Sequence, residues 1–302
     1  MRVGIIGIGS ICKKAYLPVI TAIENIELVL CTRNKETLNE VRNKYRINEF
    51  VSTVDELIEL NVDCAFVHSN TESHFEIVKQ LLTNGIHVYV DKPLSYNYEE
   101  SEELVELSRK TGKILMVGFN RRFAPMYQDL KNIGEPNIII GQKNRVGKGN
   151  DIRVFIYDNF IHVIDTLRFL MDKKHLNLEV KKLMKDDKLV NIVVQLSNDT
   201  TTAIGIMNRD SGMNEEVIEY MSSGSKIIVR DLNNTTLLVN GEEKIKNFKD
   251  WDGILYRRGF EGIINEFLNS VKNNNETSIS VEDALDTHKL CEDIIKKLEK
   301  IK

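Results

Sequence analysis

The sequence predicts an α/β protein with two domains, a doubly wound parallel sheet followed by an α+β domain with a largely antiparallel, open sheet. The chain has 302 residues, more than the roughly 250 that one hydrophobic core serves. Strands alternate with helices over about the first 120 residues, as in parallel sheets. Later strands follow one another between turn signals, as in antiparallel sheets. We expect domains at residues 1–120 and 121–302, with the C-terminal helix packing back on the first.

Composition excludes several classes of partner. Apolar residues make up 42%, charged residues 28%, and the net charge is -4, which is ordinary for a globular protein. There is no basic stripe for nucleic acid or anionic lipid. The cysteines, Cys12, Cys31, Cys64 and Cys291, lack C-x-x-C spacing, so we interpret them as reduced packing residues and expect no metal site. Since no signal peptide or membrane span is visible, we expect a cytoplasmic protein.

The first strand leads into a glycine turn. An apolar run over residues 3–8 enters Gly7-x-Gly9, and a helix is predicted over residues 13–24. This order matches the dinucleotide fingerprint of the Rossmann fold, in which the backbone approaches a pyrophosphate at the helix start. Cys12 replaces the third glycine and is small enough for close packing. The expected cofactor contacts here are Gly7, Gly9, Ser10 and Ile11.

The end of the second strand indicates which dinucleotide binds. After the strand predicted over residues 26–31 come Thr32, Arg33 and Asn34, with no carboxylate before Glu36. NAD sites usually place an acid there, whereas NADP sites supply an arginine for the 2′-phosphate. We therefore predict NADP in preference to NAD, with Thr32, Arg33 and Asn34 as contacts. The alternative is that Arg33 lies at the start of the following helix and takes no part in cofactor binding.

Small polar residues follow the next strand. Helices are predicted over residues 37–45 and 54–60, the second with Thr53 as its N-cap, and a strand over residues 64–68. Its exit carries Ser69, Asn70, Thr71 and His74, which suit contacts to cofactor ribose and phosphate. His74 is also a plausible helix-start residue.

The strand over residues 88–90 ends at Asp91-Lys92-Pro93, and we expect it at the edge of the parallel sheet. Ligands bind beyond the carboxyl ends of such strands. Proline restricts the residue before it, so Lys92 is held toward the ligand. We expect Asp91 and Lys92 to contact the cofactor. The alternative is a solvated cation at a strand end.

The remaining elements complete the two domains. A helix over residues 98–110 and a strand over 114–117 lead to Asn120, a further expected cofactor contact. A helix over 125–133, a strand over 137–145 and a helix over 158–171 follow. Residues 178–245 predict five to six strands, with one face on the 158–171 helix and the other open to a subunit. Helices over 262–271 and 281–301 close the chain.

One helix carries a proton-handling pattern. Asp158, His162 and Asp165 are spaced by four and three residues, so they share a side of a helix. A helix opening beside Asp158 also favours its carboxylate. The alternative is a capping aspartate with a structural histidine.

Together these motifs resemble the Gfo/Idh/MocA oxidoreductases. The resemblance rests on Gly7-Ile8-Gly9, Asp91-Lys92-Pro93, the run from Gly118 to Phe123, Asp158-x-x-x-His162-x-x-Asp165 and the run from Tyr256 to Glu261. It covers essentially the whole chain. Three positions depart from the family, since Asp91 replaces a glutamate, Phe160 a glycine, and Cys12 a glycine or alanine. We expect the first to leave the chemistry intact and the second to reshape the substrate pocket.

The resemblance implies an NAD(P)-dependent oxidoreductase acting on a sugar, polyol or related hydroxyl or carbonyl compound. In it Lys92 lies beside the nicotinamide and stabilises the reacting oxygen, while His162, oriented by Asp158, takes the proton. It also implies a homodimer or homotetramer through the open sheet. Expected pocket residues are Arg121, Arg145 and Tyr157. The alternative function is a non-catalytic dinucleotide-binding sensor of the same fold.

Overall fold

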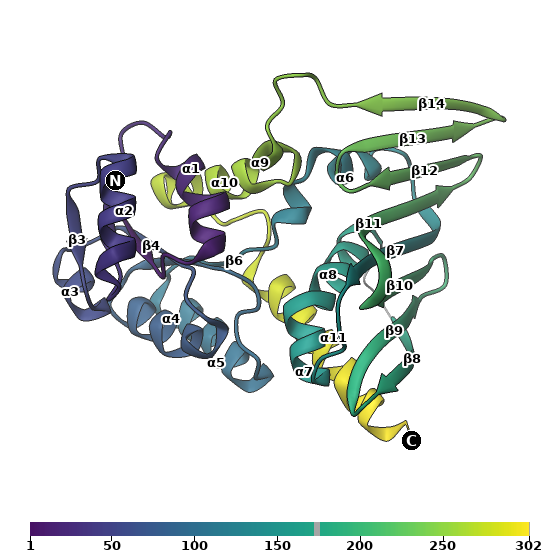
Figure 1. Ribbon diagram of the computed structural model, residues 1–302, viewed down its shortest axis with the longest axis horizontal. Helices are drawn as coiled ribbons and strands as arrows, with labels where there is room; N and C mark the ends of the chain where they lie inside the picture. The colour runs from purple at the N-terminus through teal and green to yellow at the C-terminus, as the bar shows by residue number, and fades with distance from the viewer. Residues whose placement is uncertain (172–175, 302) are drawn as a thin grey trace. The chain divides into compact units, whose positions relative to one another are not determined.

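The chain forms two compact units in this computed structural model, which describes residues 1–171 and 176–301 (Figure 1). The first unit holds Met1–Gly118 and Phe260–Asp286, and the second begins with Phe119–Gly259 and resumes at Thr287. These bounds differ from the predicted 1–120 and 121–302 because Phe260–Asp286 joins the first unit. Within the described ranges, no helix is both long and apolar enough to cross a membrane.

The first unit contains a six-stranded parallel sheet in the order β3-β2-β1-β4-β5-β6, as the alternating pattern predicts. Its central strand β4 is buried at every residue, because helices cover both faces of a doubly wound sheet. β6 pairs with β5, so β5 lies one strand in from the edge, which corrects the predicted edge position. The strands are β1 (Arg2–Ile6), β2 (Glu27–Cys31), β3 (Glu49–Val51), β4 (Cys64–Val67), β5 (His87–Val90) and β6 (Leu115–Val117).

Some helices of the first unit begin at residues whose side chains accept hydrogen bonds from the free amides of the first turn. Thr53 and Glu56 form a reciprocal capping box on α3, and the Asn97 side chain accepts from two amides of α5, as such caps do. The helical segments are η1 (Cys12–Tyr16), α1 (Leu17–Ile20), α2 (Lys35–Tyr45), α3 (Val54–Glu59), η2 (Thr71–Ser73), α4 (His74–Thr83), α5 (Tyr98–Thr111) and α10 (Phe260–Asn273). α11 (Val281–Lys300) starts in this unit and continues in the second.

The first helix differs from its prediction. It consists of the π-helical turn η1 and the short α1, and it ends at Ile20 rather than at residue 24. Pro18 lies at the start of α1 and has no N–H to continue the ladder from the preceding turn. The cysteines agree with their prediction, since all four are buried and free.

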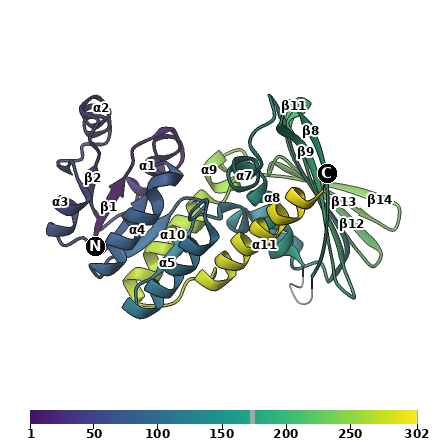
Figure 2. The same cartoon turned by 90° about the horizontal axis from the view of Figure 1, so that it is seen from below.

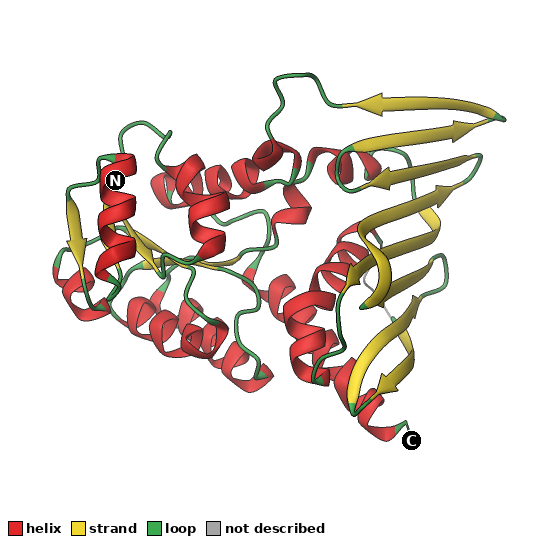
Figure 3. Cartoon of the chain, viewed as in Figure 1, coloured by secondary structure: helices red, strands yellow, loops and turns green. Residues whose placement is uncertain are grey.

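The second unit contains an eight-stranded sheet in the order β14-β13-β12-β11-β7-β10-β9-β8 (strands labelled in Figure 1 and coloured yellow in Figure 3). All of its pairs are antiparallel except β10 with β7. The strands are β7 (Pro136–Val146), β8 (Asn177–Lys185), β9 (Lys188–Ser197), β10 (Thr202–Asn208), β11 (Asp210–Ser222), β12 (Ser225–Arg230), β13 (Asn234–Val239) and β14 (Glu242–Asn247).

The prediction of five to six strands was wrong because two hairpin turns were missed. Asp186 and Asp187 both have positive φ, and so do Asn240 and Gly241. Two-residue turns of this kind join antiparallel strands tightly. They connect β8 to β9 and β13 to β14, and the region predicted over residues 178–245 holds the seven strands β8 to β14.

α8 (Ile161–Leu170) packs on the sheet over two glycines. Gly141 of β7 and Gly205 of β10 lie opposite each other in register. A Cβ built on either one would lie 3.2 Å from the Leu167 side chain, so the glycines allow the helix to approach closely. α8 and α11 lie on the same side of this sheet (Figure 2). The other helical segments are η3 (Asn120–Phe123), α6 (Pro125–Leu130), α7 (Ile152–Val154), η4 (Phe155–Phe160) and α9 (Ile254–Arg257).

Gly259 holds the end of α9 against η3. It has a φ of +77°, and a Cβ built on it would lie 2.2 Å from the Asn120 carbonyl oxygen. The Asn120 side chain also donates to the Arg258 carbonyl at 2.7 Å. This packing explains the glycine of the Tyr256-to-Glu261 motif.

We expect Gly259→Ala to destabilise the protein by about 2 kcal/mol or more, because it forces a strained backbone and a backbone clash. The measurement is the free energy of unfolding in urea. Gly212→Ala is the matched control, since a Cβ there meets nothing within 4 Å. Equal stabilities of the two variants would contradict this role for Gly259.

Candidate active site

The turn after β1 excludes side chains. Gly7 has a φ of +80°, and a Cβ built on it would lie 2.4 Å from the Ser69 amide nitrogen, so only glycine fits. At Gly9 a Cβ meets nothing within 4 Å, which leaves the backbone open. The Lys13 amide donates to the Gly9 carbonyl at 3.0 Å as the helical segment begins. This combination of a tight turn and an open backbone fits a pyrophosphate.

A cavity of about 430 Å³ opens where β1, β2 and β4 end, the edge at which open α/β sheets bind ligands. Five residues predicted to bind the cofactor line it: Gly7, Thr32, Arg33, Ser69 and Asn70. The structure therefore brings together three predicted segments that are far apart in the sequence.

The other predicted cofactor residues do not line this cavity: Gly9, Ser10, Ile11, Asn34, Thr71, His74, Asp91, Lys92 and Asn120. The Asn34 side chain caps α2 by accepting from the Thr37 amide at 2.9 Å. Asn120 belongs to the second unit. Their contacts with a cofactor stay predictions.

Sequence reasoning missed the part of the cavity wall that follows β3. Ser52, Thr53 and Asp55 line the cavity together with Gln80 of α4. The three-residue β3 was not predicted as a strand, so its exit was not recognised as a ligand-binding position. Thr53 was identified only as a helix cap.

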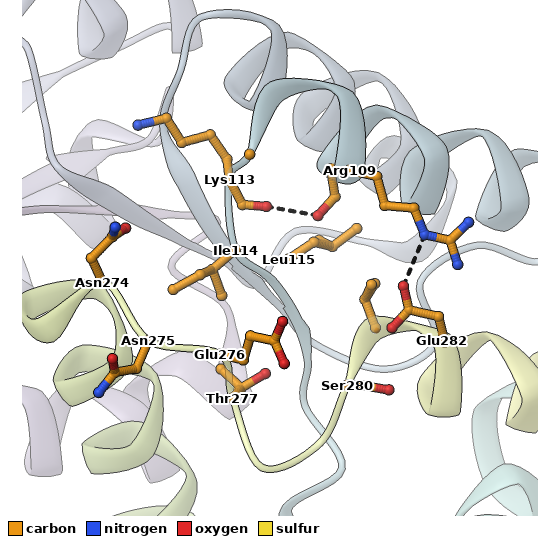
Figure 4. A pocket seen from close by; sticks show the side chains of 13 residues that line it. Arg109, Lys113, Ile114, Leu115, Asn274, Asn275, Glu276, Thr277, Ser280 and Glu282 are labelled. Carbon is orange, nitrogen blue, oxygen red and sulfur yellow. Dashed lines mark hydrogen bonds and ion pairs between the residues drawn. The ribbon is translucent and has the colours of Figure 1, made fainter.

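A second cavity of the first unit, about 370 Å³, lies at the other end of the sheet (Figure 4). It is lined by Lys113 and Leu115 at the start of β6, by Asn275, and by the exposed Arg109–Glu282 ion pair. Because parallel sheets bind ligands at the carboxyl ends of their strands, this cavity is not the cofactor site.

His74 links two strand exits. Its Nδ1 lies 2.8 Å from the Pro93 carbonyl oxygen and its Nε2 lies 3.1 Å from the Ser69 carbonyl oxygen. The ring is 1% exposed, and burial lowers its pKa. His74 therefore braces the loop after Lys92 against the loop that lines the cavity.

Lys92 follows β5 in a close-packed loop. The Lys92 amide donates to the Asp91 side chain at 2.8 Å. A Cβ on Gly118 would lie 2.8 Å from the Tyr89 hydroxyl and 3.3 Å from the Asp91 Cα, so the end of β6 must carry a glycine. Burial raises the pKa of Asp91, against the attraction of the Lys92 charge.

His68, at the exit of β4, lies in an aromatic cluster. It is 4% exposed, and its ring centroid is 3.9 Å from that of Tyr16. Neither ring nitrogen has a hydrogen-bond partner among the described residues. Burial lowers the pKa of His68 to about 3, so this histidine is neutral at physiological pH.

In the second unit, the helix that carries Asp158 and His162 begins earlier than predicted. Its first turn is α7, where the Asp151 side chain accepts from the Arg153 amide at 2.9 Å. Asp158 therefore lies inside the π-helical η4, not at a helix start. The predicted dipole effect on its carboxylate does not apply, because that effect is confined to the first turn.

Arg121 joins His162 to a buried carboxylate. Its Nη1 lies 2.8 Å from His162 Nδ1, while Nε and Nη2 donate to the two Glu216 oxygens at 2.5 and 2.8 Å. Glu216 was not predicted, because it comes from β11, 95 residues from Arg121, and no local pattern marks it. Asp158 was expected to orient His162, and Arg121 is the contact seen at Nδ1.

Asp165 is part of a different ion pair. Its oxygens accept from Arg122 Nε and Nη2 at 2.6 to 3.1 Å, and Oδ1 also lies 3.1 Å from the Thr287 hydroxyl. Asp165 is 1% exposed. It fastens α8 to η3 and α11, so the prediction of one proton-handling face with Asp158 and His162 was wrong for Asp165.

The other two predicted pocket residues lie in contrasting surroundings. Tyr157 is fully buried, with its hydroxyl 3.4 Å from both the His288 carbonyl oxygen and Glu292 Oε2. Arg145 is half-buried, and burial lowers its pKa, partly offset by Glu216. Tyr157 thus packs toward α11, whereas Arg145 keeps an accessible side chain.

The chain is similar in sequence to a known protein over nearly its full length. A Salmonella typhimurium protein named as the oxidoreductase YceM is 31% identical over 292 residues, which cover 94% of each chain. The chain belongs to the Gfo/Idh/MocA oxidoreductase family. Residues 1–119 match the profile of the oxidoreductase family with an NAD-binding Rossmann fold, and residues 125–239 match the YceM-like C-terminal domain.

Two further similar proteins are named as dehydrogenases. The crystal structure of the dehydrogenase MviM from Clostridium difficile has a TM-score of 0.94 and 37% identity, and covers 98% of this chain and 99% of that one. A myo-inositol 2-dehydrogenase from Thermotoga maritima is 27% identical over 94% of this chain and 92% of its own. The protein is an NAD(P)-dependent oxidoreductase, and its open glycine turn and adjoining cavity fit a nicotinamide dinucleotide.

The unusual Phe160 of this Gfo/Idh/MocA protein lies in the core. It is fully buried, and its ring would lie 3.2 Å from a Cβ on Gly205. The ring therefore fills space between η4 and β10, which argues against the predicted reshaping of a substrate pocket.

We expect His68→Phe to flatten the pH dependence of stability below about pH 6.5. The folded-state pKa of His68 is about 3. Below about pH 6.5 the unfolded chain therefore binds a proton at this histidine that the folded protein does not bind. This linkage costs the parent protein about 2 kcal/mol at about pH 5. The free energy of unfolding is measured at about pH 7.5 and 5.

His74 and His87, whose pKa values are also lowered by burial, remain in both proteins and cancel in the comparison. An identical loss of stability on acidification in parent and variant would contradict the prediction.

Proposed function

We propose that the protein is an NADP(H)-preferring dehydrogenase or reductase that interconverts a secondary hydroxyl and a carbonyl group on a sugar, polyol or related compound. The similarity to a myo-inositol 2-dehydrogenase over 94% of the chain supports a polyhydroxylated substrate. The observation that carries the cofactor part is the position of Arg33 in the wall of the cavity beside the glycine turn.

The preference for NADP rests on charge. Arg33 is exposed at the cavity beside Thr32, and residues 32–35 contain no carboxylate to bind a ribose 2′-hydroxyl. Asp55 also lines the cavity, but its carboxylate accepts a hydrogen bond from Gln80. A charge-assisted hydrogen bond between Arg33 and a 2′-phosphate contributes about 1.5 to 3 kcal/mol.

Arg33→Asp should weaken NADPH binding by roughly 10- to 100-fold and leave NADH binding equal or stronger. The dissociation constants of both cofactors are measured by fluorescence titration. Lys35→Asp is the matched control, because it makes the same charge change two residues away on another exposed side chain. If Arg33→Asp kept the parent's preference for NADPH, the arginine would have no part in selection.

The chemistry requires polar groups around one substrate oxygen. When bound, the nicotinamide supplies or accepts the hydride. Lys92 follows β5, the strand beside β4, and its ammonium stabilises negative charge on the oxygen. Asp158 and His162 supply the remaining polar groups. General acid-base help of this kind is worth roughly 10² to 10⁴ in rate.

The test is nicotinamide absorbance with NADP⁺ or NADPH against a panel of polyols, sugars and their keto forms. We expect turnover by the parent protein, and Lys92→Met should still bind cofactor but lose turnover by roughly 10² or more. Lys110→Met, at an exposed position of α5, is the control and should retain activity. Near-native turnover by Lys92→Met would refute its role, and tight cofactor binding without turnover by the parent would favour a sensor.

A further inference from the structure

We propose that Arg121 is a positioning residue that holds His162 as its neutral Nε2–H tautomer, so that His162 is a hydrogen-bond donor to the substrate oxygen rather than the base. The catalytic part of this inference rests on the dehydrogenase function proposed above. The tautomer itself follows from the second unit alone.

The tautomer follows from the contact at one ring nitrogen. Arg121 Nη1 lies 2.8 Å from His162 Nδ1, and a guanidinium has donors but no acceptor. His162 Nδ1 must therefore accept, which requires that it carry no hydrogen. A neutral imidazole has one N–H, so the hydrogen is on Nε2. Both the Nδ1–H tautomer and the imidazolium would place two donors face to face.

Arg121 is not free to turn away from His162. Its Nε and Nη2 form a two-point ion pair with Glu216, and both residues are at most 7% exposed. Burial opposes ionisation of Glu216, but the Arg121 charge outweighs it and lowers the pKa of Glu216 to about 2. The carboxylate stays charged, and the guanidinium stays paired, at any physiological pH.

Glu216 is in turn fixed from two sides. Its amide donates to Asp231 Oδ1 at 2.8 Å, and the Tyr127 hydroxyl lies 3.4 Å from its Oε1. β11 also pairs with β7 at Glu216 itself, opposite Lys143, and with β12 from Val217 onward. The sheet therefore sets the position of Glu216, Glu216 sets that of Arg121, and Arg121 sets the protonated nitrogen of His162.

The consequence concerns the proton of the substrate hydroxyl. Oxidation breaks the C–H bond as hydride leaves for the nicotinamide, breaks the O–H bond, and forms the C=O bond. Nε2 already carries a hydrogen and Nδ1 is occupied, so the proton passes not to His162 but through another base to solvent water. Reduction takes the proton back by the same route. In both directions the Nε2–H group donates to the oxygen.

The experiment reads the tautomer directly and needs no substrate. The protein is labelled with ring-¹⁵N histidine, and long-range ¹H–¹⁵N spectra at about pH 7 distinguish the N–H nitrogen from the bare nitrogen. His162→Gln identifies the His162 signals among those of the six histidines. We expect a single Nε2–H neutral form in the resting protein.

The test variant is Arg121→Met with Glu216→Gln, which removes the donor without leaving a buried charge unpaired. The matched control is Arg122→Met with Asp165→Asn, which removes the neighbouring pair, itself even more buried. We expect the Nδ1–H tautomer or the imidazolium to become populated at His162 in the test variant only. Thermal melting establishes that both variants are folded.

Two results would overturn the proposal. One is an Nδ1–H or doubly protonated His162 in the parent protein. The other is a test variant whose His162 spectrum equals that of the parent. The NMR samples contain neither cofactor nor substrate. A wrong tautomer prediction is therefore distinguishable from a wrong proposed function, which the absorbance panel tests. In a working enzyme, the test variant should also lose roughly 10-fold or more in turnover beyond the control.

Discussion

The second unit depends on neutralising two consecutive buried arginines. Arg121 and Arg122 are 7% and 5% exposed, and a buried unpaired guanidinium costs several kcal/mol. Each finds its carboxylate in a distant part of the chain, Glu216 in β11 and Asp165 in α8. Removing one partner of such a pair typically costs about 3 to 5 kcal/mol. The short η3 is thereby tied to the sheet and to the helix that carries His162.

The two pairs have the same chemistry but different uses. Arg122 forms an ion pair with Asp165, whose carboxylate also accepts from the Thr287 hydroxyl. This pair therefore connects η3, α8 and α11. Arg121 binds Glu216 through Nε and Nη2, and its Nη1 lies within hydrogen-bond distance of His162 Nδ1. A structural ion pair and a candidate active-site contact thus come from adjacent residues of one turn. The two arginines differ in role because they have different neighbours, not because they differ in residue type.

Local sequence patterns predicted those features of the protein that depend on interactions between residues close together in the chain. Gly7, the Thr53 cap and the buried strand β4 could all be recognised because each depends on residues close by in the chain. The cavity beside Arg33 was also predictable, since parallel strands bring their carboxyl ends together. Glu216 could not be found, because its role exists only after β11 has paired with β7. Asp165 was misassigned for a similar reason, as helical spacing cannot show that Arg122 takes up its carboxylate.

The division of the chain between the units has a consequence for synthesis. The first unit is completed by α10, whose Phe267 stacks edge-on against Phe66 at 5.1 Å and lies 5.7 Å from Tyr89. Phe260 stacks in the same way on Tyr16. These rings emerge from the ribosome only after the entire eight-stranded sheet has been made. Most of the nucleotide-binding unit precedes the eight-stranded sheet in the chain. It must therefore wait, with part of its aromatic core uncovered, until α10 is translated.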